Sequence, residues 1–214
     1  MRLVMLGAPG AGKGTQAEQL SVRLIIPAIS TGMIIRTAIR EGSDFGNRAK
    51  EYIDLGQLVP DDLMIELVSR RLEDDECARG FILDGYPRTV VQAQSLDESG
   101  IAVDRVLSIE IPDEKIVERL SGRLECEKCG ASHHILYRPP RQKGVCDVCG
   151  SNLTHRSDDH PEVIRKRLEG FHRLTEPLKK YYETRGKLCV VHGCEEIKDT
   201  TAAVFKALGI PEEN

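Results

Sequence analysis

Short apolar runs alternate with amphipathic segments along most of the chain. Four runs have the length and composition of buried strands: Arg2–Leu6, Phe81–Leu83, Val106–Ile111 and Leu188–Val191. Helical patterns or helix-start signals lie between and after them, from Lys13 to Arg23, near Thr31, after Asp61, after Pro112, from Pro161 and after Asp199. This alternation predicts an α/β fold, in which helices flank a parallel sheet and the crossovers are right-handed. Pro177 is expected to break or kink the helix that begins at Pro161, because proline removes a helical hydrogen bond.

Two segments interrupt the alternation. Residues 122–159 have no convincing helical pattern and contain glycines, prolines and four closely paired cysteines, which is typical of a small inserted domain. Residues 30–59 are flanked by turn residues and carry a helical pattern, so they predict a second, helical insertion.

The composition excludes several classes of protein. With 214 residues, 40% apolar and 30% charged, the chain has room for one substantial domain or a core with small appendages, and it does not resemble a disordered or fibrous protein. No apolar run approaches the roughly 20 residues of a membrane-spanning helix, and the N-terminus lacks a long signal-peptide core. We therefore expect a cytoplasmic protein. The net charge of −4 argues against a general nucleic-acid binder, which would need a basic surface.

A glycine-rich loop after the first strand is the strongest single motif. Gly7–Thr15 has the GxxxxGK pattern between a predicted strand and a predicted helix, so its backbone N–H groups and the helix N-terminus can bind phosphate oxygens. Lys13 supplies a mobile charge for the β- and γ-phosphates. The hydroxyl that usually follows the lysine comes one residue later, at Thr15. The alternative is a glycine-rich turn that binds nothing.

A second candidate for phosphate chemistry follows the strand at Phe81–Leu83. Asp84 ends this strand, and in phosphate-loop folds a carboxylate there often reaches Mg²⁺ directly or through water. The turn Gly85-Tyr86-Pro87-Arg88 then delivers Arg88 to the same sheet edge, where ligands of open α/β sheets bind. Taken alone, Asp84 is equally consistent with a turn or a helix cap.

The paired cysteines predict a structural metal site. Cys126-x2-Cys129-x16-Cys146-x2-Cys149 provides two thiolate pairs that can complete a tetrahedral shell around Zn²⁺, with no open position for a substrate. Iron can occupy such a site as well. The alternative is four free thiols. The remaining cysteines have no such spacing: Cys77, Cys189 and Cys194.

Arginines recur at the edges of the predicted segments and around the insertion. The set is Arg36, Arg88, Arg119, Arg123, Arg156 and Arg167. Any one of them is most often a solvated surface residue. Together they suit a site that brings two polyanions close together, as phosphoryl transfer requires.

Several of these motifs occur together in adenylate kinases, and the chain resembles the long bacterial form of that family, which has a metal-bearing lid. The resemblance extends over essentially the whole chain. It rests on motifs in matching order: GAPGAGKGTQA at the start, STG followed by Arg36, GQLVPD at 56–61, GFILDGYPRT at 80–89, ERLSGR at 118–123, the four-cysteine insertion, and RSDD at 156–159 followed by Arg167.

The resemblance implies the phosphate-loop nucleoside monophosphate kinase fold in three parts. The core would comprise 1–29, 60–121 and 160–214, the monophosphate-binding domain 30–59, and the lid 122–159. The implied reaction is reversible transfer of the terminal phosphoryl group of MgATP to AMP, giving two ADP. The implied partners are these nucleotides, with Mg²⁺ alongside ATP, structural Zn²⁺ in the lid, no nucleic acid or membrane partner, and a monomeric state.

The resemblance also assigns roles to individual residues. ATP would contact Gly10, Ala11, Gly12, Lys13, Gly14, Thr15, Arg119, Arg123, Ser132, His133 and Glu195. AMP would contact Thr31, Arg36, Gln57, Leu58, Val59, Gly85, Tyr86, Pro87, Arg88, Gln92, Arg156 and Arg167. The catalytic set would be Lys13, Arg36, Asp84, Arg88, Arg123, Arg156 and Arg167. Asp158 and Asp159 would support lid closure and the placement of the arginines.

The chain departs from the family pattern in one stretch. An aspartate usually follows the STG motif, and this chain has Met33, so we expect closure of the lid onto the monophosphate domain to be weaker or kcat to be altered. Within Leu24–Ala28 the family commonly has an aromatic residue, a glycine and then a histidine. Because Ile25 cannot easily adopt the positive φ open to glycine, we expect a different local backbone or a more deeply buried segment.

Two other functions fit part of this pattern. One is a related nucleoside monophosphate kinase that accepts UMP, CMP or GMP. The other is a nucleotide-gated binding protein whose zinc ribbon contacts a nucleic acid or a protein partner. The second phosphate site implied by the arginines is unnecessary in a pure binding protein, so it favours a kinase.

Overall fold

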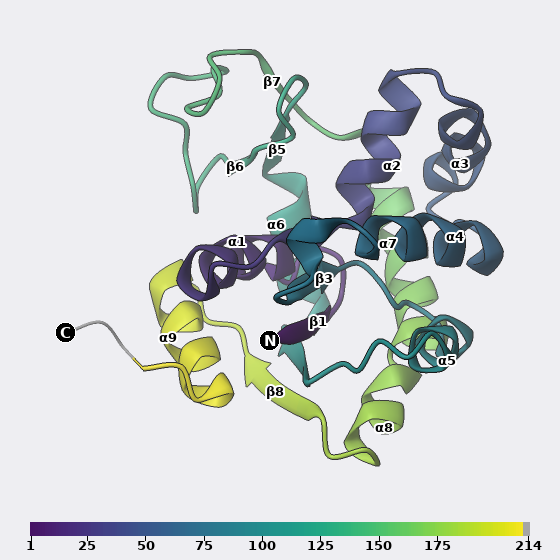
Figure 1. Cartoon of the computed structure of the whole chain (residues 1–214). Helices are drawn as coiled ribbons and strands as arrows, with labels where there is room; N and C mark the ends of the chain where they lie inside the picture. The colour runs from purple at the N-terminus through teal and green to yellow at the C-terminus, as the bar shows by residue number, and fades with distance from the viewer. Residues whose placement is uncertain (212–214) are drawn as a thin grey trace.

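A parallel sheet lies at the centre of the molecule (Figure 1). The computed structural model describes residues 1–211, and the sheet order is β2 (Ala28–Ser30), β3 (Phe81–Asp84), β1 (Arg2–Leu6), β4 (Arg105–Glu110) and β8 (Leu188–His192). All four neighbouring pairs run parallel, which confirms the predicted α/β class. Four of these strands correspond to the predicted runs. The three-residue β2 was not predicted.

Alternate residues of the central strand face opposite sides of the sheet. Leu3 and Met5 of β1 pack with α1 (Lys13–Leu24) and α9 (Ile197–Leu208). Val4 and Leu6 pack on the other side, with residues of α4 (Asp61–Leu72), α5 (Val90–Glu98) and α8 (Pro177–Glu183). Both faces are therefore covered, as parallel sheets require.

A third, smaller apolar cluster lies beside the phosphate loop. Ile116 and Leu120 of α6 (Asp113–Ser121) pack there against Ile164 and Leu168 of α7 (Pro161–Gly170), together with Ala8. This cluster joins the loop after β1 to the two helices that flank the 122–159 insertion.

The α-helix that begins at Pro161 is interrupted before Pro177, as predicted: α7 ends at Gly170, and α8 begins at Pro177. A π-helical turn, Phe171–Thr175, joins α7 to α8, and Glu176 N donates to Phe171 O five residues earlier. The wider turn accommodates the missing N–H of Pro177 and the bulk of its ring within a continuous helical backbone. It also lets the two halves face different clusters, since Leu178 and Tyr182 pack in the large cluster on the sheet.

The 30–59 segment is helical, as predicted. It contains α2 (Thr31–Arg40) and α3 (Asp44–Asp54), and the Ser30 hydroxyl caps α2 by accepting from Met33 N. Ile35, Ala49 and Val59 are buried in the same apolar cluster as the core residues of α4 and α5. This insertion therefore folds as an extension of the core.

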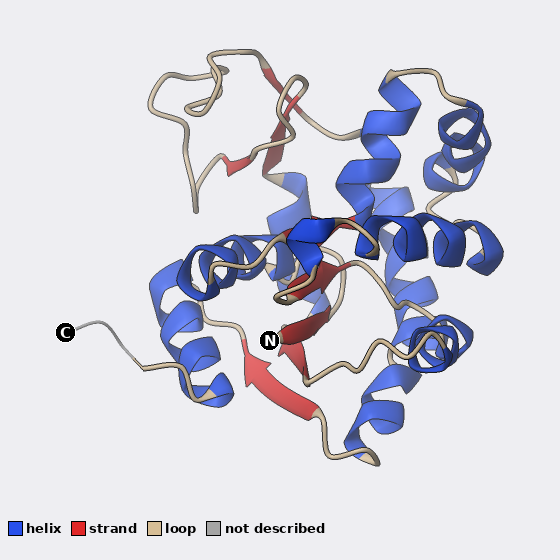
Figure 2. Cartoon of the chain, viewed as in Figure 1, coloured by secondary structure: helices blue, strands red, loops and turns tan. Residues whose placement is uncertain are grey.

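The 122–159 segment forms a small antiparallel sheet: β5 (Arg123–Cys126), β6 (Ser132–His134) and β7 (Leu153–Thr154). No α-helix occurs within it, and a single 3₁₀ turn covers Ser157–Asp159. Figure 2 shows the contrast between this loop-rich segment and the all-helical one beside it. Both project from the same end of the core (Figure 1).

Ile25 corrects the expectation for the stretch before β2. It adopts the left-handed conformation of a helix C-cap, with φ of 53°, and is the only non-glycine residue of 1–211 with a positive φ. Its side chain is 77% exposed, so the segment does not bury it, and its neighbour Ile26 enters the core. The backbone thus keeps a glycine-like geometry with a β-branched residue, which is a strained arrangement.

No helix among residues 1–211 is both long and apolar enough to cross a membrane.

Candidate active site

A cavity of about 970 Å³ opens at the carboxyl end of the sheet, between the core and the two insertions. Most of the predicted site residues line it: Gly10, Ala11, Gly12, Lys13, Gly14, Thr15, Thr31, Arg36, Gln57, Leu58, Val59, Asp84, Gly85, Pro87, Arg88, Gln92, Arg119, Arg123, Ser132, His133, Arg156, Asp158, Arg167 and Glu195. Tyr86 and Asp159 are outside this lining, and both are buried. The cavity therefore gathers residues from segments far apart in the sequence.

The phosphate loop curls around the lysine at the start of α1. Gly12 has φ of 95° at the helix N-cap, a conformation that favours glycine. Lys13 Nζ donates to the carbonyls of Gly7 and Ala8, at 2.8 Å each. Burial lowers the pKa of Lys13 to about 8, and the neighbouring arginines act in the same direction. An incoming anion would favour the charged ammonium here.

The end of β3 brings a carboxylate and an arginine beside this loop. A Cβ built on Gly14 would lie 3.4 Å from Asp84 Oδ2, so the carboxylate faces the start of α1. Gly85 has φ of 87°, and a Cβ there would lie 2.7 Å from Thr31 Oγ1, so only glycine fits at the contact with α2. Arg88 Nε donates to Gly85 O at 2.9 Å, and burial lowers the pKa of Arg88.

Gln92 is held at both ends of its amide by the protein. Its Oε1 accepts from Arg88 N at 2.7 Å, and its Nε2 donates to Asp61 Oδ1 at 2.8 Å. Tyr86 lies behind it in the core, where its hydroxyl donates to Gln92 O. Burial raises the pKa of Tyr86 to about 12. Tyr86 therefore supports this wall from behind, while Gln92 presents a fixed amide to the cavity.

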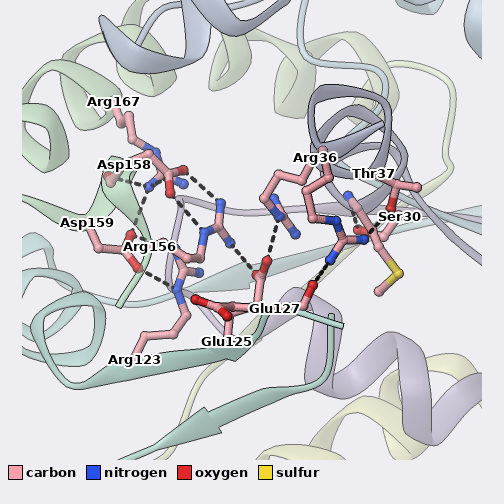
Figure 3. Close-up of polar contacts among 12 residues, drawn as sticks. Ser30, Arg36, Thr37, Arg123, Glu125, Glu127, Arg156, Asp158, Asp159 and Arg167 are labelled. Carbon is pink, nitrogen blue, oxygen red and sulfur yellow. Dashed lines mark hydrogen bonds and ion pairs between the residues drawn. The ribbon is translucent and has the colours of Figure 1, made fainter. Parts of the chain in front are cut away.

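Three arginines and two adjacent aspartates form a buried network at the lid boundary (Figure 3). Arg123 makes a two-point contact with Asp159, at 2.7 and 2.6 Å, and Arg156 makes one with Asp158, at 2.8 and 2.7 Å. Arg167 donates to Asp158 O and to Asp159 Oδ1. The two-point contacts fix the orientation of the Arg123 and Arg156 guanidinium groups.

The network also sets the protonation states of its members. Burial opposes ionisation of Asp158, but Arg156 and Arg167 outweigh it and hold the pKa of this carboxyl well below its usual range. Burial, with Arg123 and Arg156 nearby, lowers the pKa of Arg167 to about 10. Arg156, Arg167 and Asp158 are therefore all charged at neutral pH. The cavity consequently faces a substrate with fixed positive charge.

Comparisons with known proteins agree with this geometry. The family profile described as Adenylate kinase matches residues 5–187. The chain belongs to the adenylate kinase family. Proteins named adenylate kinase are similar over nearly the full length of both chains. That of Caldicellulosiruptor bescii is 56% identical, covering 98% of this chain and 100% of its own. That of Acetivibrio thermocellus is 50% identical, covering 97% and 98%, and that of Carboxydothermus hydrogenoformans is 45% identical, covering 97% and 99%.

The opposite end of the cavity in this adenylate kinase family member is bordered by α6 and the lid. Arg119 Nη2 donates to Cys194 O at 2.7 Å and so fixes the loop that carries Glu195, whose own side chain is 80% exposed. Ser132 and His134 lie on one face of β6, while the His133 side chain is buried on the other. Both His133 ring nitrogens lack a hydrogen-bond partner among the described residues. His133 therefore borders the cavity without offering an exposed ring.

The four lid cysteines converge on one point. Their Sγ atoms all lie within 4.8 Å of one another, with Cys126–Cys149 at 3.4 Å and Cys129–Cys146 at 3.6 Å. A tetrahedral Zn²⁺ with Zn–S bonds of about 2.3 Å requires sulfur separations of about 3.8 Å, so the cluster is compatible with zinc. Hydrogen bonds from Ser151 lower the pKa of the Cys149 thiol to about 6, which favours the thiolate.

Among the cavity residues absent from the sequence prediction, Tyr137 and Glu125 make polar contacts with predicted site residues or their neighbours. Tyr137 of the lid lies with its ring centroid 5.6 Å from the Arg119 guanidinium, and its hydroxyl donates to Glu118. Glu125 of β5 accepts from Arg36, 89 residues earlier in the chain. Nothing in the spacing of either residue marks it for the site, because both are brought there by the pairing and closure of the lid.

Proposed function

We propose that this chain catalyses reversible transfer of the terminal phosphoryl group of MgATP to AMP, giving two ADP, and so balances adenine nucleotides in the cytoplasm. The observation that carries the proposal is a single cavity with a phosphate loop at one end and a second set of arginines at the other. A protein that only binds one nucleotide does not need two phosphate subsites joined by bridging arginines.

The donor nucleotide would occupy the side formed by the phosphate loop, α6 and the lid. Backbone N–H groups of residues 10–15 and Lys13 would hold its phosphates. Arg123, fixed by Asp159, would contact the same phosphates, while Arg119 and Tyr137 offer a cationic and an aromatic surface for the base. Ser132, His133 and Glu195 would border the adenosine.

The acceptor would occupy the side formed by α2, β3 and the start of α5. Arg36 and Arg88 would bind its phosphate, and Thr31, Gln92 and the backbone of residues 57–59 would border its base and ribose. Arg156 and Arg167 would lie between the two nucleotides and stabilise the transferring group. Asp158 and Asp159 hold these arginines in place.

The reaction needs no covalent intermediate and no strong base. An AMP phosphate oxygen is already a competent nucleophile, so the protein contributes alignment and neutralisation of the charges that otherwise repel. Water is a competing acceptor, and closure of both insertions before transfer would exclude it.

Two metal ions belong to this proposal. Asp84 faces the phosphate loop. One carboxylate, together with waters and substrate phosphates, is a typical ligand set for Mg²⁺. A bound Mg²⁺ would neutralise the charge of the phosphates. The four cysteines would hold structural Zn²⁺ and keep the lid rigid as it moves. The two parts that move would be the monophosphate-binding domain, residues 30–59, and the lid, residues 122–159. The enzyme would act as a monomer.

A phosphoryl-transfer assay tests the proposal most directly. MgATP is combined with AMP, GMP, CMP or UMP, and nucleoside diphosphate formation is followed. We expect strong turnover with AMP alone. Preferential turnover with another acceptor would move the assignment to a sister kinase, and ATP binding without turnover on any acceptor would contradict a kinase function.

A further inference from the structure

The lid and helix α2 touch directly across the acceptor side of the cavity. Arg36 Nε donates to Glu125 Oε1 at 2.8 Å, and the Arg40 guanidinium donates to the Glu127 carbonyl (Figure 3). Met33 lies against the lid as well, since a Cβ on Gly130 would be 3.5 Å from its side chain. The carboxylate that joins the two insertions therefore comes from the lid. The family resemblance instead leads one to expect a carboxylate on α2, at position 33.

Glu125 has a second cationic partner. Its other oxygen, Oε2, lies 3.4 Å from Arg156 Nη1. The side chains of Glu125, Arg36 and Arg156 are 15%, 26% and 13% exposed, so this bridge is largely shielded from solvent. A carboxylate removed from water in this way needs close cationic partners, and both partners here line the cavity.

The chemistry of this bridge resembles that of a bound phosphate. Carboxylate and phosphate oxygens accept from guanidinium groups in the same fork geometry. Arg156 is engaged through Nε and Nη2 with Asp158, so Nη1 is the nitrogen that Glu125 approaches. Glu125 thus neutralises positive charge at the place where the acceptor phosphate would need it.

We infer that Glu125 competes with the acceptor phosphate for Arg36 and Arg156, and that AMP must displace it from both arginines to bind. This rests on the proposed function, which assigns Arg36 to the acceptor phosphate and places Arg156 between the two nucleotides. Glu125 is then a specificity-determining residue of the lid that sets the affinity for the acceptor and leaves the donor side unaffected. Through its hydrogen bond with Arg36, Glu125 also joins the lid to α2. Binding of AMP would replace this contact with one between Arg36 and the AMP phosphate.

The test compares Glu125→Gln with Glu127→Gln. Both remove one negative charge from the same part of the lid. The Glu127 side chain is exposed and takes part in none of the ion pairs among the described residues, so it serves as the matched control. Binding of AMP alone and of MgATP alone is measured by calorimetry, and KM for AMP is measured with saturating MgATP.

We expect Glu125→Gln to bind AMP about three- to tenfold more tightly than the parent, because a negative charge within a few ångströms no longer competes with the phosphate. KM for AMP falls in parallel, while the Kd for MgATP changes less than about twofold, as expected for a charge outside the donor subsite. Glu127→Gln leaves both affinities unchanged. Glu125→Asp, which keeps the charge but is shorter by one methylene group, should bind AMP with intermediate affinity. It provides a second variant if the glutamine variant is unstable.

An unchanged or weaker affinity of Glu125→Gln for AMP would overturn the inference, since Glu125 would then orient the arginines and not compete with the substrate. Equal tightening of AMP and MgATP would also overturn it, because the effect would be one of general charge. Failure of the parent enzyme to bind AMP at all would instead contradict the proposed function.

Discussion

The two insertions differ in what holds them together. Residues 30–59 contribute Ile35, Ala49 and Val59 to the largest apolar cluster of the core. Residues 122–159, all of which the structure describes, contribute nothing to the three apolar clusters. The buried side chains of the lid are Cys126, His133, Cys146, Asp158 and Asp159.

This difference shows how one chain can carry two insertions of unequal independence from the core. The helical insertion shares apolar packing with α4 and α5, so its stability is coupled to that of the core. The lid is too small to build an apolar core, and four converging thiols take that role. The apolar packing of the core therefore does not depend on the lid.

The largest effect is expected from Cys146→Ser, which removes one ligand of the lid cluster. If metal alone organises the lid, the substitution should lower its stability by on the order of 5 kcal/mol or more and abolish stoichiometric metal binding. Calorimetric unfolding and elemental analysis measure both. Cys194→Ser, at an exposed thiol, should change stability by less than about 0.5 kcal/mol.

Chelation of the metal extends this test to activity. We expect thermal stability to fall more than initial turnover does, because the four metal-site cysteines of the lid lie outside the cavity lining. Immediate and complete loss of turnover in a still-folded protein would show that the cluster shapes the site directly.

Ile35→Ala tests the other half of the comparison. Ile35 is 4% exposed in the core cluster, so its truncation should destabilise the whole core by about 2–5 kcal/mol in a single cooperative transition. Urea denaturation followed by circular dichroism measures this. Val148→Ala, at a lid side chain 70% exposed, should have almost no effect. A core transition that Ile35→Ala leaves unchanged would mean that both insertions are separable.

A smaller, stabilising effect is expected at the entrance to the helical insertion. Ile25→Gly should raise the free energy of unfolding by up to about 1 kcal/mol, because glycine relieves the left-handed backbone strain but is more flexible when unfolded. Ile25→Ala removes the same exposed apolar surface and keeps a Cβ, so it is the control. Equal stability of the two variants in urea would contradict backbone strain as the cause.

The smallest expected effect is a dependence of stability on pH, caused by a histidine in the part of the chain outside both insertions. Hydrogen bonds to Glu176 and Asp113 raise the pKa of His172 above its usual 6.5. A raised folded-state pKa gives stability that is fully present below pH 6.5 and lost as the pH rises through the folded-state value. Because the ring is 44% exposed, the loss should be about 0.5 kcal/mol or less.

His172→Gln should remove that dependence and leave the rest of the stability–pH curve intact. Parallel thermal unfolding between pH 5.5 and 8.5 decides the point. A slope that persists in the variant would place the responsible group elsewhere.

Much of the fold followed from local patterns, and the exceptions have physical causes. Strands β1, β3, β4 and β8 are apolar runs that end in turn residues, so their sequence marks them. Strand β2 has three residues and depends on its pairing with β3, which no local pattern records. The π-helical turn before Pro177 was missed because proline alone does not say whether the preceding turn will widen.

The site divides in the same way. The phosphate loop and the paired cysteines are motifs whose spacing carries their chemistry, whereas Asp84 and the arginines point to the site only as a set. The structure gathers all of them around one cavity or one cluster. Glu125 and Tyr137 depend on where the lid settles against Arg36 and Arg119. At Ile25 the residue type was a misleading guide to the backbone. Although isoleucine disfavours a positive φ, Ile25 still adopts the left-handed geometry that its surroundings impose.

The π-helical turn at Phe171–Thr175 restricts which insertions and deletions this stretch of the chain can tolerate. Each residue rotates a helix by about 100°, so deleting a single codon here would swing Arg167 away from its aspartates or withdraw Leu178 and Tyr182 from the sheet. Substitutions cannot restore a lost rotation. The number of residues in this turn is thus more tightly constrained than their identities, although the resemblance assigns no role to any of the five.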